Sequence, residues 1–219
     1  MTHANTIAMC SLVLCFSACG GATEQTENHT SSPGEVSAST EAPAPAGVSQ
    51  AEAREAVEGL DVSQFTSAPR RLLAKAELDA PVEEVWTYIS NHDNLVEYTN
   101  GVLTEATIDR AGASETNGVG TRRECQAGDD RFVENIVYFR APYVFAYQAV
   151  ENTWGLDGHL ATVVLKPSAD GGTVLEWSQY FNTVQPDMAP MMTQNMTGMF
   201  QQRVLPFFTE RFGGEVLPS

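Results

Sequence analysis

Positive charge and cysteine are both scarce in this chain. The sequence has 12 Lys and Arg against 28 Asp and Glu, which gives a net charge of −16 and a pI of about 4.5. Phosphate binding needs clustered cations, so this composition argues against nucleic acid as a partner. Of the 4 cysteines, only Cys125 follows residue 19. The folded part therefore offers no disulfide and no cysteine pair for zinc or redox chemistry, and Cys125 is expected to be a half-buried strand residue.

Signatures of catalysis are lacking as well. We find no Ser-His-Asp set, no paired-carboxylate signature and no phosphate loop, since no helix follows Gly118-Val-Gly120 and this pair is typical of a hairpin turn. Of the histidines, only His92 and His159 lie in the part that is expected to fold. We expect His92 in a loop or capping segment and His159 in an exposed turn. The sequence thus predicts no catalytic residue, no metal and no cofactor.

The first residues resemble a targeting signal. Residues 7–18, IAMCSLVLCFSA, are mostly apolar; this run is too short to span a membrane, which takes about 20 residues, and suits the core of a signal peptide. The following Cys19-Gly20-Gly21 resembles the lipobox of bacterial lipoproteins. The resemblance implies that residues 1–18 are a signal peptide and that Cys19 carries a lipid. An ordinary signal peptide that is cleaved near Ala18 is the alternative.

The resemblance also implies a location. Gly20 stands where an Asp would resemble an inner-membrane retention signal, so we expect a lipid anchor in the outer membrane, facing the periplasm of the bacterial envelope. Residues 20–48 have almost no large apolar side chains and are predicted to form a disordered acidic tether. Ser49-Gln-Ala-Glu52 is a possible capping box for a short helix to about Leu60, which packs on the domain or stays free. The predicted parts are 1–18, 19–64 and a folded domain at 65–219.

From Arg70 onward the sequence has the periodicity of a folded domain. Alternation of apolar and polar residues in 71–79 predicts a half-buried strand. The spacing of Val82, Val85, Trp86 and Ile89 predicts a helix, and residues 188–212 have a helical period too. Between them lie six segments with strand character whose connections are too short for crossover helices, so the sheet should be antiparallel. These segments are 102–109, 120–128, 131–140, 143–150, 160–168 and 173–183.

Three stretches in this domain resemble a known superfamily. They are ELDAPVEEVWTYISN, GVGTRR and VENIVYFRAPYVFAY, and together with the methionine-rich C-terminal segment they resemble the START-like (SRPBCC) superfamily, in particular its polyketide cyclase/dehydrase branch. The resemblance covers residues 70–212. It implies an α+β helix-grip fold, in which a curved seven-stranded antiparallel sheet wraps a long C-terminal helix around an internal hydrophobic cavity.

Candidate ligand-binding residues follow from this fold. On a helix, Met188, Met192, Met196 and Met199 form, with Phe200 and Phe207, one stripe about 120° wide, which would face the sheet. Arg203 falls within this stripe and either reaches solvent or meets an acid or an anionic ligand. Small residues on the first strand would leave room for a guest, and one of Glu134 and Asn135 should point inward. A plain core with methionine as gap filler is the alternative. The candidates are Met192, Met196, Met199, Phe200, Arg203, Trp177, Gln179, Phe181, Glu134, Ala74 and Ala76.

Three functions remain open at this point. The first is the binding or transfer of a hydrophobic small molecule or lipid by a domain tethered to the membrane. The second is a cyclase or dehydratase that uses Glu134, Gln179 or Arg203 as polar groups. The third is a protein-interaction module in which the cavity has collapsed into a core.

Overall fold

The computed structural model describes residues 49–218. The predicted signal peptide, Cys19 and the predicted tether up to residue 48 lie outside these residues. None of the described helices is long and apolar enough to cross a membrane. The helices are α1 (Gln50–Glu58), α2 (Val82–Ile89), α3 (Leu95–Tyr98), α4 (Ala189–Met199) and α5 (Leu205–Phe212). The strands are β1 (Arg70–Leu78), β2 (Glu105–Asp109), β3 (Arg122–Ala127), β4 (Asp130–Arg140), β5 (Val144–Asn152), β6 (Leu156–Pro167), β7 (Thr173–Thr183) and β8 (Glu215–Leu217).

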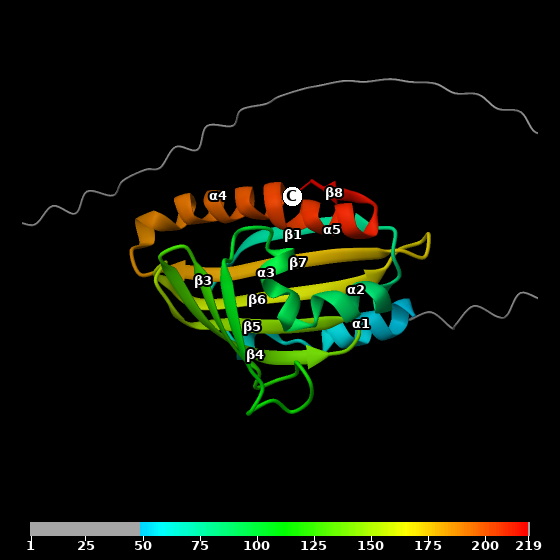
Figure 1. Ribbon diagram of the computed structural model, residues 1–219, viewed down its shortest axis with the longest axis horizontal. Helices are drawn as coiled ribbons and strands as arrows, with labels where there is room; N and C mark the ends of the chain where they lie inside the picture. The colour runs from blue at the N-terminus through cyan, green and yellow to red at the C-terminus, as the bar shows by residue number, and fades with distance from the viewer. Residues whose placement is uncertain (1–48, 219) are drawn as a thin grey trace, which may run out of the picture. The chain divides into compact units, whose positions relative to one another are not determined.

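All strands belong to one curved antiparallel sheet (Figure 1). Its order is β2-β3-β4-β5-β6-β7-β1-β8, so the first long strand closes against the last long one. The predicted α+β helix-grip fold is confirmed, with one difference in strand number. The sheet has 8 strands because the short β8 pairs with β1 at the edge. Three residues carry too little pattern to be recognised as a strand.

The short helix α1 packs against the sheet. Its predicted capping box is present, with Ser49 and Glu52 each bonded to the other's backbone N–H. Ala53 and Ala56 are buried. The hydroxyl of Tyr138 in β4 donates to the carbonyl of Ala56 at 3.0 Å, which fixes the helix on the sheet. A helix of this length is marginal alone, so these contacts account for its presence.

The C-terminal helix lies along the sheet (Figure 1) and contains an irregular turn. Residues Phe200–Val204 form a π-helical segment between α4 and α5. It lies just before Pro206, whose ring nitrogen has no hydrogen to donate to the helix. Because of the wider turn, the buried positions repeat every four residues instead of every 3.6. They are Met196, Phe200, Val204, Phe208 and Phe212, and Leu205 is buried beside them.

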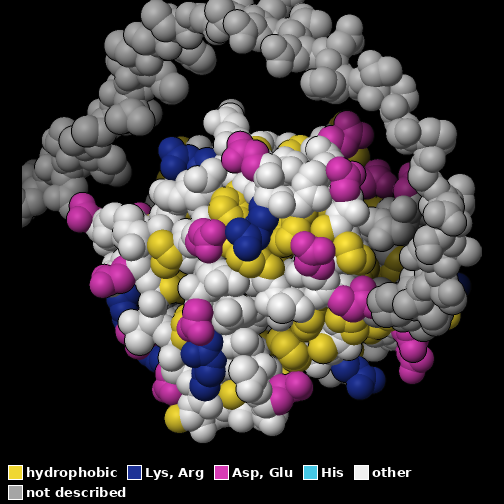
Figure 2. All heavy atoms as spheres, turned by 45° about the vertical axis from the view of Figure 1, so that its right-hand side comes forward, with side chains coloured by type: hydrophobic (Ala, Val, Ile, Leu, Met, Phe, Trp, Pro, Cys, Tyr) yellow, Lys and Arg dark blue, Asp and Glu magenta, His cyan; other side chains and the backbone are white. Residues whose placement is uncertain are grey.

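The surface outside this core is acidic and mixed. Figure 2 shows Asp and Glu side chains scattered across the face in view, among fewer Lys and Arg. Acid–base pairs on the described surface are mostly exposed, such as Arg54 with Glu58 at 2.7 Å. Exposed pairs of this kind add little stability. The polar contacts that matter most for stability are therefore expected in the protein interior.

Candidate functional site

A cavity of about 80 Å³ lies between the C-terminal helix and the sheet. An apolar cavity of about 150 Å³ can hold benzene, and sites for drug-sized ligands usually have about 300–1,000 Å³. The cavity is therefore small in this structure, and a larger guest would require its walls to move. The helix contributes Met196, Met199, Phe200 and Val204; other lining residues include Leu95, Leu103, Arg123, Cys125, Phe132, Glu134, Tyr147, Trp154, His159, Trp177 and Gln179.

Six of the predicted site residues line this cavity. They are Met196, Met199, Phe200, Trp177, Gln179 and Glu134. The question of Glu134 or Asn135 is thereby answered, since Glu134 is the residue that faces inward. Met192 lies beside the cavity instead, in an adjoining hollow that it shares with Trp154 and Asn195.

The other predicted residues lie elsewhere. Phe181, Ala74 and Ala76 are fully buried in the packed core and do not line the cavity. Ala74 is the register partner of Trp177, so the small side chain makes room for the indole and for the helix, which packs on β1. Arg203 is exposed, and its guanidinium lies 3.4 Å from the carbonyl oxygen of Gly101. The π turn shifts the buried face towards Val204, so Arg203 leaves the stripe in which a regular helix would place it.

A buried ion pair stands at the polar end of the cavity. The Arg123 side chain is 1% exposed, and its Nη2 lies 2.7 Å from Oε2 of Glu134 on the neighbouring strand. Its guanidinium also stacks over the ring of Tyr147, 4.2 Å from the centroid. Burial is the largest single effect and opposes the charge of Arg123, but Glu134, acting together with Tyr98, Tyr147 and Cys125, outweighs it, so the pKa of Arg123 is raised. Arg123 was not among the predicted site residues, although it shares strand parity with the buried Cys125.

His92 is buried next to this ion pair. It begins a short 3₁₀ turn, His92–Asn94, and is 0% exposed. Its Nε2–H donates to the carbonyl of Asn117 at 3.1 Å, and its Nδ1 faces Nη1 of Arg123 at 3.5 Å. Burial, helped by the charge of Arg123, lowers the pKa of His92 to about 2. The imidazole is therefore held neutral and acts as an acceptor that orients Arg123.

The prediction for His159 was wrong, because this residue is buried in β6 at 5% exposure. The pairing of β6 with β7 is irregular between Asp157 and Leu160, and Gly158 has a φ of 60°. This bulge turns the imidazole inward, where the sequence Gly-His suggested a turn. Burial lowers the pKa of His159, although Glu134 nearby acts in the opposite direction.

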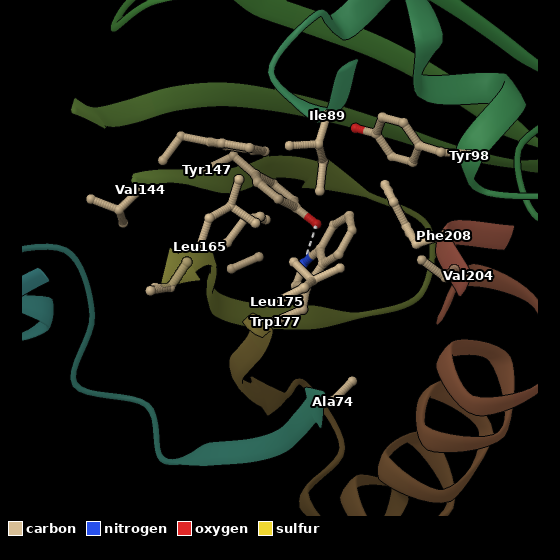
Figure 3. Close-up of a cluster of buried hydrophobic side chains, with 14 of the residues drawn as sticks. Ala74, Ile89, Tyr98, Val144, Tyr147, Leu165, Leu175, Trp177, Val204 and Phe208 are labelled. Carbon is tan, nitrogen blue, oxygen red and sulfur yellow. Dashed lines mark hydrogen bonds between the residues drawn. The ribbon is translucent and has the colours of Figure 1, made fainter. Parts of the chain in front are cut away.

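Two aromatic residues connect these polar groups to the apolar core. The indole N–H of Trp177 donates to the hydroxyl oxygen of Tyr147 at 3.3 Å (Figure 3). Burial raises the pKa of Tyr147, so the phenol stays protonated. Burial also raises the pKa of the Cys125 thiol to about 12, and a thiol in this state is a poor nucleophile. Among residues 49–218, no group of three or more His, Cys, Asp and Glu could hold a metal ion.

Comparison with known proteins assigns the family. The family model described as "Polyketide cyclase / dehydrase and lipid transport" matches residues 70–205. The chain belongs to this family. A search of curated proteins finds no match.

Solved structures agree on the fold. A protein from Thermobifida fusca is 21% identical, with a TM-score of 0.55, 65% of this chain covered and 92% of the other. A START superfamily protein from Mycobacterium smegmatis is 13% identical, with a TM-score of 0.54 and coverages of 64% and 95%. Norcoclaurine synthase from Thalictrum flavum is 16% identical, with a TM-score of 0.50 and coverages of 67% and 97%. At these identities the likeness shows the fold alone.

Proposed function

We propose that the domain binds a small hydrophobic molecule in the cavity between α4 and the sheet. The observation that carries the proposal is the cavity itself, which has apolar walls and one polar end, as ligand sites usually do. The family's description includes lipid transport, which is compatible with an apolar guest. The volume of about 80 Å³ favours a small molecule over a whole lipid.

The methionines explain how such a cavity admits a guest. Met196 and Met199 lie between the cavity and the adjoining hollow, and each of these two side chains lines both spaces. Methionine has an unbranched, flexible side chain that adapts to irregular shapes. Rotation of these two side chains would join the two spaces and enlarge the site without a change in the sheet.

We also propose that the domain is tethered to the outer membrane through a lipid on Cys19, where it would capture or transfer its ligand in the envelope. The support is the signal-like run and lipobox in the sequence. A Cys19→Ala chain should then lose incorporation of labelled fatty acid and leave the membrane fraction. Unchanged lipid labelling in this variant would contradict the anchor.

Native mass spectrometry tests the cavity. The sample is a chain that begins at Gly20, keeps every described residue and is purified from a bacterial host without detergent. We expect a non-covalent adduct that is lost on denaturation, either directly or after incubation with an envelope extract. A clean mass in both cases would favour the interaction module with a closed core.

A cyclase or dehydratase is the second candidate, because Glu134 places a carboxylate at the cavity. Acid–base chemistry needs such a group within hydrogen-bond reach of a substrate. This carboxylate is already paired with Arg123 at 2.7 Å, so a substrate would have to share it with the guanidinium. Turnover of a bound polyketide-like substrate that is lost in Glu134→Gln, with binding retained, would support the enzyme.

A further inference from the structure

The hydrogen bonds at the polar end of the cavity fix the direction of each donor. The backbone N–H of Ala149 donates to Nδ1 of His159 at 3.0 Å, so this nitrogen carries no proton. A neutral imidazole has its proton on the other nitrogen. Nε2 of His159 therefore donates to Oε1 of Gln179, at 2.8 Å. The amide nitrogen of Gln179 is left as the donor end of the chain.

Beside this chain, the hydroxyl oxygen of Tyr147 accepts one hydrogen bond. The indole N–H of Trp177 lies 3.3 Å from this oxygen (Figure 3). Because the oxygen accepts from the indole, the hydroxyl hydrogen is left to donate to another group. Among the described residues, none accepts a hydrogen bond from this hydroxyl, and Tyr147 lines the cavity.

The charges at this end of the cavity cancel. Arg123 and Glu134 form an ion pair at 2.7 Å, and both His92 and His159 are held neutral by burial. An anionic guest would meet the carboxylate of Glu134 without a free cation to offset it. A second donor, Nε of Arg123, is also buried and has no partner among the described residues. The site thus offers unused donors and no net positive charge.

We propose that the guest is an uncharged apolar molecule with a carbonyl or similar acceptor oxygen, which accepts the hydroxyl hydrogen of Tyr147. This inference rests on the proposed ligand-binding function and specifies the chemistry of the ligand. A buried hydroxyl without a hydrogen-bond acceptor is costly. A guest that supplies an acceptor should therefore bind more tightly than a hydrocarbon of the same shape. Tyr147 is then the residue that sets specificity, while the methionines provide the apolar contact.

Three probes of nearly equal shape test the inference: acetophenone, ethylbenzene and benzoate. Binding to the chain from Gly20 onward is followed by the resonances of isotope-labelled methionine methyl groups. Tyr147→Phe should lower the affinity for acetophenone relative to ethylbenzene by about 3- to 10-fold, the range of one neutral hydrogen bond. Tyr138→Phe is the matched control, since that hydroxyl bonds to Ala56 outside the cavity. In Tyr138→Phe the ratio of the affinities for acetophenone and ethylbenzene should be unchanged.

The infrared carbonyl stretch of acetophenone bound to the unmodified chain is a second readout, which does not depend on how well Tyr147→Phe folds. It should lie below its position in hexane, as for a hydrogen-bonded carbonyl. An unshifted stretch, or an unchanged affinity ratio while both probes bind, would overturn the inference and leave ligand binding intact. If benzoate binds most tightly of the three, the inference that the ligand is uncharged is overturned. Absence of binding by all three would count against the proposed function itself.

Discussion

The two walls of the cavity are built on different principles. On the sheet side, Arg123, Tyr147 and His159 each contact at least one polar or aromatic neighbour at a defined distance. On the helix side, Met196 and Met199 face the cavity with thioether side chains that have many rotamers. The sheet wall is suited to specify a ligand and the helix wall to adapt to its shape. The following predictions test this division, beginning with the largest expected effect.

Removal of the buried cation should have the largest effect. Arg123→Met leaves Glu134 as an uncompensated charge inside the protein, which should reduce the free energy of unfolding by about 3–5 kcal/mol. Urea unfolding measures this. Arg131→Met is the control, because Arg131 pairs with Glu151 at 3.0 Å but is 40% exposed; it should cost about 0–1 kcal/mol. Equal losses in the free energy of unfolding for the two variants would show that the Arg123–Glu134 ion pair does not stabilise the sheet wall more than an exposed pair does.

A large side chain on the helix wall should close the site. Met196→Trp fills the cavity, so binding of acetophenone should be lost, with a destabilisation of about 1–3 kcal/mol from overpacking. Met191→Trp lies on the same helix and is 47% exposed in the unmodified protein, so it should leave binding unchanged. Isothermal calorimetry distinguishes the two. Retained binding in Met196→Trp would place the guest elsewhere.

The neutral histidines should make the fold sensitive to acid. The pKa of His92 is about 2 in the folded state against 6.5 as the ordinary value, so below pH 6.5 the unfolded chain binds a proton that the folded chain does not. The contribution of His92 to the free energy of unfolding is therefore fully present above pH 6.5. It decreases as the pH falls, and about 2 kcal/mol of it is lost by pH 5. His159 acts in the same direction.

The matched variant for this effect is His92→Gln, which keeps a side-chain donor for the carbonyl of Asn117. Urea unfolding between pH 8 and pH 5 should show a smaller decrease for the variant than for the unmodified chain. Identical decreases in the two chains would mean that His92 becomes protonated within the fold.

The smallest effect is expected at Arg203. Its side chain is exposed and reaches only the carbonyl of Gly101, at 3.4 Å. Arg203→Ala should change the free energy of unfolding by less than about 0.5 kcal/mol, and the affinity for acetophenone should not change. A marked loss of affinity would mean that the helix wall also recognises polar groups.

Much of the fold could be predicted from local sequence pattern. The alternation around Leu72 and Leu78, the helical spacing from Val82 to Ile89 and the capping box at Ser49 each report local geometry, and each agrees with the structure. The short β8 could not be predicted, since it depends on pairing with β1 across the whole chain. Pairing of this kind is a tertiary property without a local signal.

The site was less predictable because small irregularities reorient its residues. The π turn at Phe200–Val204 moved Arg203 out of the buried face, and the bulge near Gly158 turned His159 into it. A regular period of 3.6 or of two cannot anticipate either change. Arg123 was missed for another reason: its partner Glu134 comes from a different strand, and a buried cation is plausible only once its partner is known.

Methionine methyl resonances of the chain from Gly20 onward, recorded as acetophenone is added, test the central account most directly. The account predicts shifts at Met196 and Met199, which line the cavity, with saturation, and none at the exposed Met191. Shifts of equal size at Met191, or none at any methionine, would contradict it, because the methionines would then be part of a closed core or of an unspecific apolar surface.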